Sequence, residues 1–323
     1  MSASKNEEME KEAFEELIEF IKTNRSFDFT GYKRSSLMRR VNKRMAEVGI
    51  DSYSEYQDYL QVHPDEFNDL FNTILINVTR FFRDEAAWDF LQNEALPLLL
   101  DRKGDHAHIR AWSVGCASGE EVYTLAIILA EALGRDQFKR RVKIYATDID
   151  QEAINFARHS HYTRQELQDV PEQYREKYFQ PSDDKFMFDK ELRRSVIFGV
   201  HDVVQAAPIS RLDLLLCRNT LMYFNLETQK KVLARFHFAL SDYGILFLGM
   251  AETMLTRDRF FGPLNQELRI FKKLPVTDIR SHAAAFGVLP EPTTEITARQ
   301  QLYEASFHCS PPHSLSSIRR VSS

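Results

Sequence analysis

The sequence predicts a doubly wound α/β sheet that follows an all-helical N-terminal domain and carries a small antiparallel β insertion. Three observations support this prediction. Apolar residues recur at helical spacing through roughly the first 75 positions, and short apolar runs then alternate with helical patterns. A stretch with strand-like alternation interrupts that order between residues 160 and 200. Strands that alternate with helices are typical of a parallel sheet covered on both faces.

The composition excludes several classes of protein. The 323 residues carry a net charge of −5 and are 43% hydrophobic, which is ordinary for a globular protein. Apolar runs stay far below the ~20 residues of a membrane helix, and the polar, acidic start is unlike a secretory signal. Cys116, Cys217 and Cys309 lack metal-binding spacing and cannot all pair. We therefore expect a cytoplasmic protein with no metal site, no membrane insertion and no nucleic-acid partner.

The helical domain is expected over residues 1–76 and combines two helices of opposite charge. Residues 1–20 hold seven Glu against two Lys, with apolar positions at helical spacing. A second helix is predicted over Lys33–Met45, with Leu37, Val41 and Met45 on one stripe. The rest of its surface is basic, through Lys33, Arg34, Arg39, Arg40, Lys43 and Arg44. Two further helical patterns follow, around residues 52–62 and 64–76.

The α/β domain is expected over residues 77–273. Its predicted strands cover residues 110–114, 142–146, 212–217, 244–250 and 268–271, and its predicted helices cover 121–133, 151–158 and 228–239. The antiparallel insertion is expected at about residues 180–200 and includes 185–188 and 195–198. Residues 274–323 are rich in Ser, Thr and Pro, which predicts a disordered tail.

A turn of small residues follows the first predicted strand, where Gly115, Ala117 and Gly119 alternate before Glu120 and Glu121. Such a turn lets the backbone approach a ligand closely, and dinucleotide folds use it to hold phosphate on a helix N-terminus. Two carboxylates at the helix start would repel phosphate. They favour S-adenosylmethionine (SAM), which carries an ammonium and a sulfonium, over NAD or ATP. The alternative is a plain turn before an acidic helix start.

Polar residues also follow two other predicted strands. Asp148 ends the second strand, where an acidic residue can accept both ribose hydroxyls, whereas Asp150 is expected to cap the next helix. Arg218 and Asn219 follow the most apolar strand, and Tyr223 lies four residues further on. An Arg at that rim is costly unless a ligand or an acid pairs with it. A capping Asn and a core Tyr are the alternatives.

The junction between the two domains places Asn77, Thr79 and Arg83 beside Phe81 and Phe82. The pattern alone favours a hydrophobic hinge decorated with polar residues.

Taken together, these segments resemble the CheR-type chemoreceptor glutamate methyltransferases over roughly residues 10–273. The two most specific strings are Asn77-Val78-Thr79-Arg80-Phe81-Phe82-Arg83 and Cys217-Arg218-Asn219 with Tyr223-Phe224. The other matching segments are Gly115 to Glu121 with Tyr123, Ala146 to Asp150, and Phe247 to Glu252.

The resemblance implies a class I SAM-dependent methyltransferase that converts receptor glutamates to methyl esters and releases S-adenosylhomocysteine (SAH). By position, the residues that contact SAM would be Asn77, Thr79, Arg83, Glu121, Asp148, Asp202, Val203, Arg218 and Asn219. Arg83 and Tyr223 would face the transferred methyl group and the incoming carboxylate. The chain departs from the family at Asp202-Val203, where Asn-Leu is common, and at Gly249 to Glu252, where Gly-His-Ser-Glu is common.

The resemblance also gives the basic helix a role, because chemoreceptor methylation regions are rich in Glu. Residues 1–76 would then recognise the receptor, with the six basic side chains steering it. A solvated amphipathic helix is the alternative. Family members can also grip a receptor's C-terminal peptide with the β insertion, but the short, glycine-free turn at Pro181–Asp184 argues against that here. Other methyltransferases on the same fold and a silent SAM-binding module are the competing functions.

Overall fold

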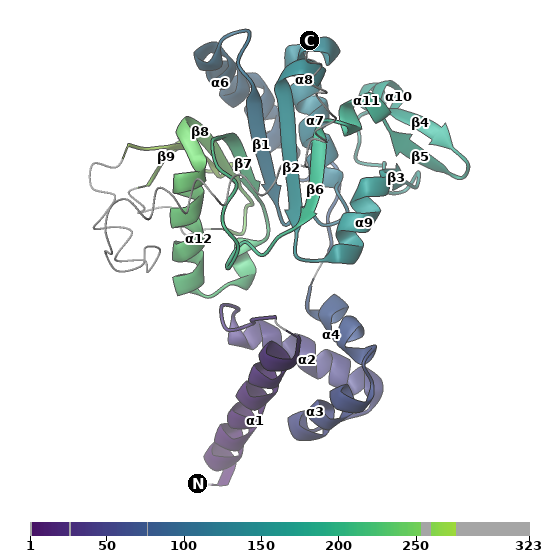
Figure 1. Ribbon diagram of the computed structural model, residues 1–323, viewed down its shortest axis with the longest axis vertical. Coiled ribbons are helices and arrows are strands. Elements are labelled where there is room, and N and C mark those ends of the chain that lie inside the picture. Colours follow the sequence, from purple (N-terminus) through teal and green to yellow (C-terminus); the bar gives the residue numbers. More distant parts are fainter. Residues whose placement is uncertain (1, 26, 76, 253–259, 276–323) are drawn as a thin grey trace, which may run out of the picture. The chain divides into compact units, whose positions relative to one another are not determined.

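The computed structural model describes residues 2–25, 27–75, 77–252 and 260–275. The first compact unit of the chain runs from Met1 to Thr277 and contains both the helical region and the sheet. The described helical region consists of α1 (Ser2–Arg25), α2 (Arg34–Val48), α3 (Tyr53–Val62) and α4 (Glu66–Ile74) (Figure 1).

The apolar stripes of the first two helices form the core of the helical region, as predicted. Leu37, Val41 and Met45 of α2 are buried at spacings of four, and Leu17 and Ile21 of α1 pack into the same cluster. Gly49 ends α2 in the left-handed conformation, so its N–H can bond back to Ala46. The charged side chains are thereby left on the outside of the helices.

The described strands of the α/β region form a seven-stranded sheet in the order β6-β2-β1-β7-β8-β10-β9. The five strands from β6 to β8 are parallel, and β10 and β9 add antiparallel pairs at one edge. The central strand β7 is buried at every position, as its apolar run predicted. The strands are β1 (Ile109–Val114), β2 (Val142–Asp148), β6 (Val196–Val200), β7 (Leu212–Cys217), β8 (Leu240–Leu248), β9 (Phe261–Asn265) and β10 (Ile270–Lys273).

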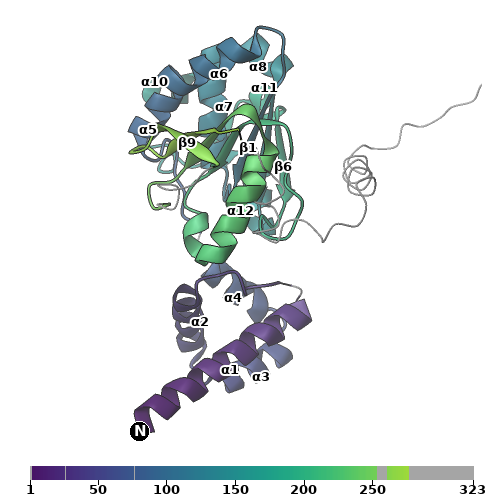
Figure 2. The same cartoon turned by 90° about the vertical axis from the view of Figure 1, so that its left-hand side faces the viewer.

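Helices flank this sheet and connect its strands (Figure 2). The connection from β1 to β2 runs through α7 (Glu120–Leu133) and α8 (Arg135–Arg141), and α9 (Gln151–His159) follows β2. The others are α5 (Glu85–Phe90), the π-helical turn η1 (Leu91–Ala95), α6 (Leu96–Lys103), α10 (Glu172–Tyr178), α11 (Lys190–Arg193), the 3₁₀ turn η2 (Leu221–Tyr223) and α12 (Leu226–Ala239). The doubly wound fold class is confirmed.

One segment predicted for the antiparallel insertion belongs to the main sheet instead. The small antiparallel sheet contains β3 (His161–Tyr162), β5 (Lys185–Phe188) and β4 (Phe179–Ser182), in that order. The segment expected at 195–198 is instead β6, a parallel edge strand of the main sheet beside β2. Val196 and Phe198 are buried while Ile197 is exposed. This alternation shows that one face of the strand is covered by the core. An edge strand has the same pattern whether its neighbour is parallel or antiparallel.

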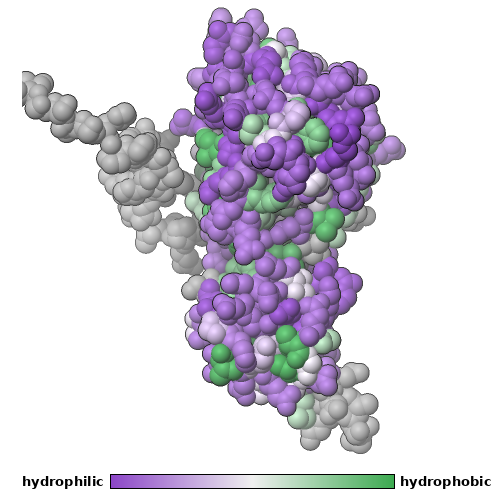
Figure 3. Space-filling view, turned by 90° about the vertical axis from the view of Figure 1, so that its right-hand side faces the viewer, coloured by the Kyte–Doolittle hydropathy of each residue, from purple (hydrophilic) through white to green (hydrophobic). Residues whose placement is uncertain are grey.

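Hydrophilic residues cover most of the face shown in Figure 3, and hydrophobic residues appear there in separate spots. Among the described residues, no helix combines the length and apolar character needed to cross a membrane. Within the same residues, no group of three or more His, Cys, Asp or Glu is placed to hold a metal ion. The tail predicted from residue 274 onward lies almost entirely outside the described residues.

Candidate active site

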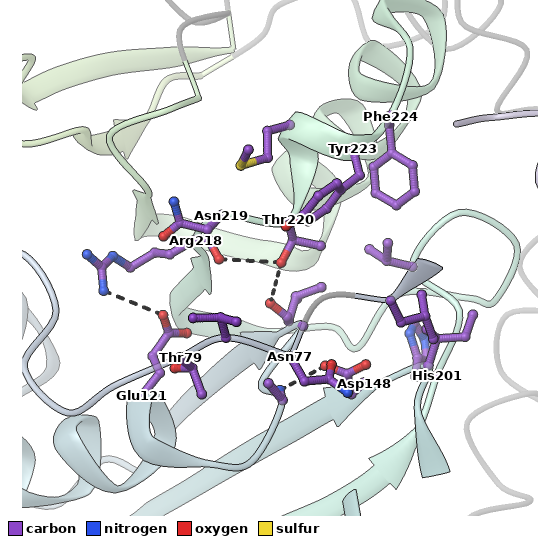
Figure 4. Close-up of a pocket in the computed structure, with 18 of the residues that line it drawn as sticks. Asn77, Thr79, Glu121, Asp148, His201, Arg218, Asn219, Thr220, Tyr223 and Phe224 are labelled. Atoms are coloured by element: carbon purple, nitrogen blue, oxygen red, sulfur yellow. Dashed lines mark hydrogen bonds and ion pairs between the residues drawn. The ribbon is translucent and has the colours of Figure 1, made fainter. Parts of the chain in front are cut away.

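A pocket of about 270 Å³ lies at the carboxyl ends of the parallel strands, where ligands of open α/β sheets bind (Figure 4). Residues that are far apart in the sequence meet in its wall. It brings together all ten predicted site residues: Asn77, Thr79, Arg83, Glu121, Asp148, Asp202, Val203, Arg218, Asn219 and Tyr223.

The turn between β1 and α7 forms one wall of this pocket. The N–H groups of Gly115 and Cys116 donate to the carbonyl oxygen of Thr147 at 2.8 and 3.0 Å, which ties the turn to the end of β2. Gly115 has a φ of +69°, and a Cβ added there would lie 2.2 Å from Thr220 Oγ1. Glycine is therefore required both by the backbone conformation and by the close approach of Thr220.

Glu120 and Glu121, the two carboxylates at the start of α7, lie in different surroundings. Glu121 lines the pocket, accepts a hydrogen bond from Ser113 Oγ at 2.7 Å and lies 3.6 Å from an Arg218 nitrogen. Glu120 is buried against Ser118, which donates to it, and is not part of the pocket lining. Burial raises the pKa of Glu121, and Arg218 and Ser113 oppose that rise. The pocket therefore presents Glu121 to a ligand, as expected.

Asp148 and Asp150 also divide as predicted. Asp148 lines the pocket and accepts the N–H groups of Ala117 at 2.8 Å and Asp150 at 3.0 Å, one on each oxygen. Burial raises its pKa, and these backbone hydrogen bonds oppose the rise. Asp150 caps α9 by accepting from Glu152 and Ala153, and Asn77 donates to its other oxygen. A carboxylate has about four acceptor positions, so Asp148 can still accept a hydrogen bond from a ligand in the pocket that it lines.

Arg218 is paired with acids of the chain itself. Its side chain is 2% exposed, donates to Asp84 at 2.6 Å and to the backbone oxygen of Arg83 at 2.8 Å, and lies near Glu121. The guanidinium also lies 4.6 Å from the ring centroid of Phe247. These contacts fasten the segment before α5 to the end of β7. They pair the buried charge that is costly when unpaired, although the buried Nε of Arg218 has no hydrogen-bond partner among the described residues.

The segment from Asn77 to Arg83 has both the buried aromatic residues of a hydrophobic hinge and polar residues that line the pocket. Phe81 and Phe82 are buried in the main core, and Phe82 donates its N–H to Thr124 Oγ1 at 3.2 Å. With these aromatic anchors fixed, Asn77, Thr79 and Arg83 line the pocket.

Asp202 and Val203 line the pocket next to His201, a residue that sequence reasoning missed. Asp202 caps its own turn by accepting the N–H groups of Val204 and Gln205 at 2.7 and 3.2 Å. The N–H of His201 donates to the Asp148 backbone oxygen at 2.9 Å, which joins the two acidic segments. No local motif in the sequence marks His201.

Other lining residues were also missed. Val78, Arg80 and Thr220 lie inside the recognised strings, so the strings themselves could have indicated them. Tyr32 comes from the loop between α1 and α2, and nothing local to it points to a pocket. Gly115, Ala117, Ile149 and Phe224 also line the pocket and lie inside segments that the sequence singled out, whereas Ile74, Leu75, Val114 and Met222 were missed.

The pocket suits the donor pattern of SAM. Glu121 and Asp148 offer acceptors for an ammonium group and for paired hydroxyls, and Ile149, Val203 and Met222 add apolar surface. The acidic start of α7 is unsuited to a phosphate. The residues present therefore fit SAM, the cofactor that the two carboxylates at the start of the helix favoured.

Comparisons with known proteins agree with this geometry. Residues 77–270 match the family described as CheR methyltransferase, SAM binding domain, and residues 12–75 match the CheR methyltransferase, all-alpha domain. The chain is 32% identical over 268 residues to the putative methyltransferase Cher3 of Pseudomonas putida, covering 80% of this chain and 95% of that protein. It is 31% identical over 251 residues to a chemotaxis protein methyltransferase of Borreliella burgdorferi, covering 76% and 89%.

A longer relative is an uncharacterized 104.1 kDa protein of Rhodobacter capsulatus, which is 31% identical over 286 residues. That match covers 87% of this chain and 30% of the relative. Two adjoining family matches and a pocket that fits SAM lead to one conclusion. The chain belongs to the CheR family of SAM-dependent methyltransferases.

Proposed function

We propose that this protein methylates glutamate side chains of chemoreceptors, the methyl-accepting chemotaxis proteins, and thereby serves adaptation in chemotaxis-type signalling. The products are a glutamyl methyl ester and SAH. The observation that carries the proposal is the meeting of Arg83 and Tyr223 with Glu121 and Asp148 in one pocket. The first pair suits an incoming carboxylate, and the second pair suits the cofactor.

Arg83 and Arg218 differ in what remains available for a substrate. The Arg218 guanidinium is committed to Asp84, the Arg83 backbone and Glu121. Arg83 is half-buried, and the hydrogen bond found for its guanidinium within the described residues is a long one, 3.4 Å to the Val78 carbonyl. A guanidinium binds a carboxylate through charge-assisted hydrogen bonds. Arg83 can therefore hold one oxygen of a glutamate while the other attacks.

Tyr223 is suited to orient the same carboxylate. Burial raises the pKa of its hydroxyl, opposed by Arg40 and Arg83, so the hydroxyl is protonated at neutral pH and can donate. A glutamate is already ionised at that pH, so the reaction needs no general base. When bound, SAM supplies a methyl group on a cationic sulfur that leaves as a neutral thioether when the carboxylate oxygen bonds to the methyl carbon. The protein has to align these atoms at about 3 Å and exclude water.

The remaining predicted residues would hold the cofactor. Glu121 would accept the methionine ammonium, Asp148 the ribose hydroxyls, and Asp202 with Val203 would border the adenine. The other proposed cofactor contacts are Asn77, Thr79, Arg218 and Asn219.

The receptor would dock along α2, although the structure reduces the basic surface predicted there. Arg44 is half-buried and pairs with the buried Glu66 and the exposed Asp69 at 2.6 and 2.9 Å, and Arg34 and Lys43 pair with Glu15 and Glu47. These ion pairs neutralise half of the six charges. Among the described residues, no ion pair involves the other three basic residues, Lys33, Arg39 and Arg40.

The basic surface also reaches the active site. A second pocket is lined by Arg40, Lys43 and Arg44 of α2, and it shares Asn77 and Val78 with the cofactor pocket. An acidic helix that docks on α2 would thus lie beside the cofactor pocket. This continuity supports a protein substrate over a small molecule.

The direct test is transfer of tritiated methyl from SAM to a chemoreceptor signalling domain, read out as base-labile methyl ester. Arg83→Ala should lower kcat roughly 100-fold, and Tyr223→Phe should lower it less, because each removes a donor that faces the reacting carboxylate. Calorimetry should show that both variants still bind SAH, with weaker binding by Arg83→Ala because Arg83 is also an expected cofactor contact. Arg194→Ala, an exposed arginine that pairs with Glu191, is the control and should react like the unaltered enzyme. Absence of base-labile label with every receptor domain, or full turnover in both variants, would refute the proposal.

A further inference from the structure

The loop between α1 and α2 contributes a residue to the cofactor pocket. This loop belongs to the all-alpha region, yet Tyr32 lines the same pocket as Asp148 and Asp202. The loop lies 116 or more positions before those carboxylates in the sequence. The helical region therefore forms part of the pocket wall, in addition to the proposed receptor surface.

Backbone hydrogen bonds fix the loop to the segment that carries Tyr223. Tyr32 and Phe224 form an isolated antiparallel bridge. The Lys33 N–H donates to the Tyr223 carbonyl at 2.9 Å, and the Asn225 N–H donates to the Gly31 carbonyl at 2.9 Å. The ring of Tyr32 packs edge-on against that of Phe224, with centroids 5.0 Å apart. These contacts define where the phenol of Tyr32 stands.

A Cβ on Gly31 would lie 2.9 Å from Thr228 Oγ1, so the loop approaches α12 closely. Position 31 thus needs glycine for contact with α12, which holds the neighbouring Tyr32 at the pocket.

The chemistry of the phenol suits a ligand. Burial, and the carboxylates of Asp202 and Asp148, raise the pKa of the Tyr32 hydroxyl, so it stays protonated and can donate a hydrogen bond. Its ring adds apolar surface next to the two carboxylates that face the nucleoside in the proposed function. An aromatic ring with one polar end can pack against a nucleoside and bond to one of its heteroatoms.

We propose that Tyr32 is a cofactor-binding residue, supplied by the helical region, whose phenol contacts the nucleoside part of SAM and SAH. This inference rests on the cofactor placement given under the proposed function. It has a second consequence, because a ligand that contacts the loop must favour the docked loop. Binding of SAH should then slow hydrogen exchange at the amides of Lys33 and Asn225, the two donors that join the loop to the sheet region.

The test measures SAH binding to the full chain by calorimetry. Tyr32→Phe removes a hydrogen bond and should weaken binding about 3- to 10-fold. Tyr32→Ala also removes the ring and should weaken binding by roughly 30-fold or more. Tyr59→Ala is the matched control, since Tyr59 is a half-buried tyrosine of α3 outside the pocket lining, and it should bind like the unaltered protein. Circular dichroism establishes that each variant is folded.

The following outcomes would contradict the role of Tyr32 in cofactor binding. Affinity within twofold of the unaltered protein for both Tyr32 variants, or unchanged exchange at Lys33 and Asn225, overturns the inference. Normal binding by Tyr32→Phe alone overturns the donor role of the hydroxyl. Asp148→Ala separates this inference from the cofactor placement. If Asp148→Ala binds SAH normally, the cofactor placement itself is wrong. If Asp148→Ala loses affinity for SAH while both Tyr32 variants bind normally, only the role of Tyr32 is refuted.

Discussion

At the scale of single residues, neighbours of the same type have different roles because their partners differ. Glu121 faces the pocket, whereas Glu120 is buried against Ser118. Asp148 keeps acceptor positions for a ligand, whereas Asp150 caps a helix. Each distinction follows from which donors the folded chain brings to a carboxylate.

The affinity for SAH should fall as the pH is lowered through the acidic range. Burial raises the pKa of Glu121 and of Asp148, so these carboxylates take up protons at a higher pH than exposed ones do. An ammonium or hydroxyl donor stabilises the ionised carboxylate, so binding releases protons, and affinity increases as the carboxylates lose them. Calorimetry in two buffers of different ionisation enthalpy measures that release. Glu121→Gln should reduce both the release and the pH dependence, and a flat pH profile for the unaltered protein would contradict this account.

At the scale of elements, α2 combines two functions on different faces. Its apolar stripe packs in the helical core, and Arg44 joins a buried ion-pair network with Glu66. Tyr56 donates to the same carboxylate at 2.7 Å. Replacing Arg44 would leave the buried carboxylate of Glu66 without its cationic partner, so that substitution would test stability rather than docking. The docking role is left to the outward residues, among them Arg39 and Arg40.

The double variant Arg39→Glu/Arg40→Glu should raise the apparent KM for a receptor domain about 3- to 10-fold at low salt. It should also flatten the salt dependence of KM, because exposed charges act through screened attraction. Steady-state kinetics from low to high salt measure both effects. The matched control is Lys139→Glu/Arg140→Glu on α8, which changes the net charge equally outside both pockets near α2. Equal KM changes in the two double variants would show that net charge causes the effect, and would contradict docking of the receptor along α2.

At the scale of the whole molecule, the described pocket and sheet lie before the last part of the sequence. The residues that line the cofactor pocket run from Tyr32 to Phe224. The described sheet is completed by β10, whose Lys273 donates to the Leu240 carbonyl at 2.7 Å. The first compact unit ends at Thr277.

A chain ending at Thr277 should bind SAH within twofold of the full chain. Its free energy of unfolding should lie within about 0.5 kcal/mol of the full value, as for changes away from the core and the ligand site. Calorimetry and urea unfolding of both chains provide the comparison. A larger loss of affinity or stability would show that residues 278–323 contribute to the unit.

Much of the active site could be predicted from the sequence because it depends on position along strands. The end of a parallel strand lies at one edge of the sheet, so Asp148 after β2 and Arg218 after β7 had to approach each other. The partners of those residues could not be predicted in the same way. The pairing of Arg218 with Asp84 joins positions 134 residues apart, and no local pattern records it.

The sequence by itself determined the fold class, the elements that build the sheet and the strings that place the chain in its family. These features depend on local periodicity and on short motifs, which a linear chain displays directly. Only the tertiary structure decided that β6 joins the main sheet, that Arg44 pairs with the buried Glu66, and that Tyr32 lines the pocket. Alternation along a strand reports which face is covered but not which strand lies beside it, and ion pairs and pocket walls depend on segments that meet only after folding.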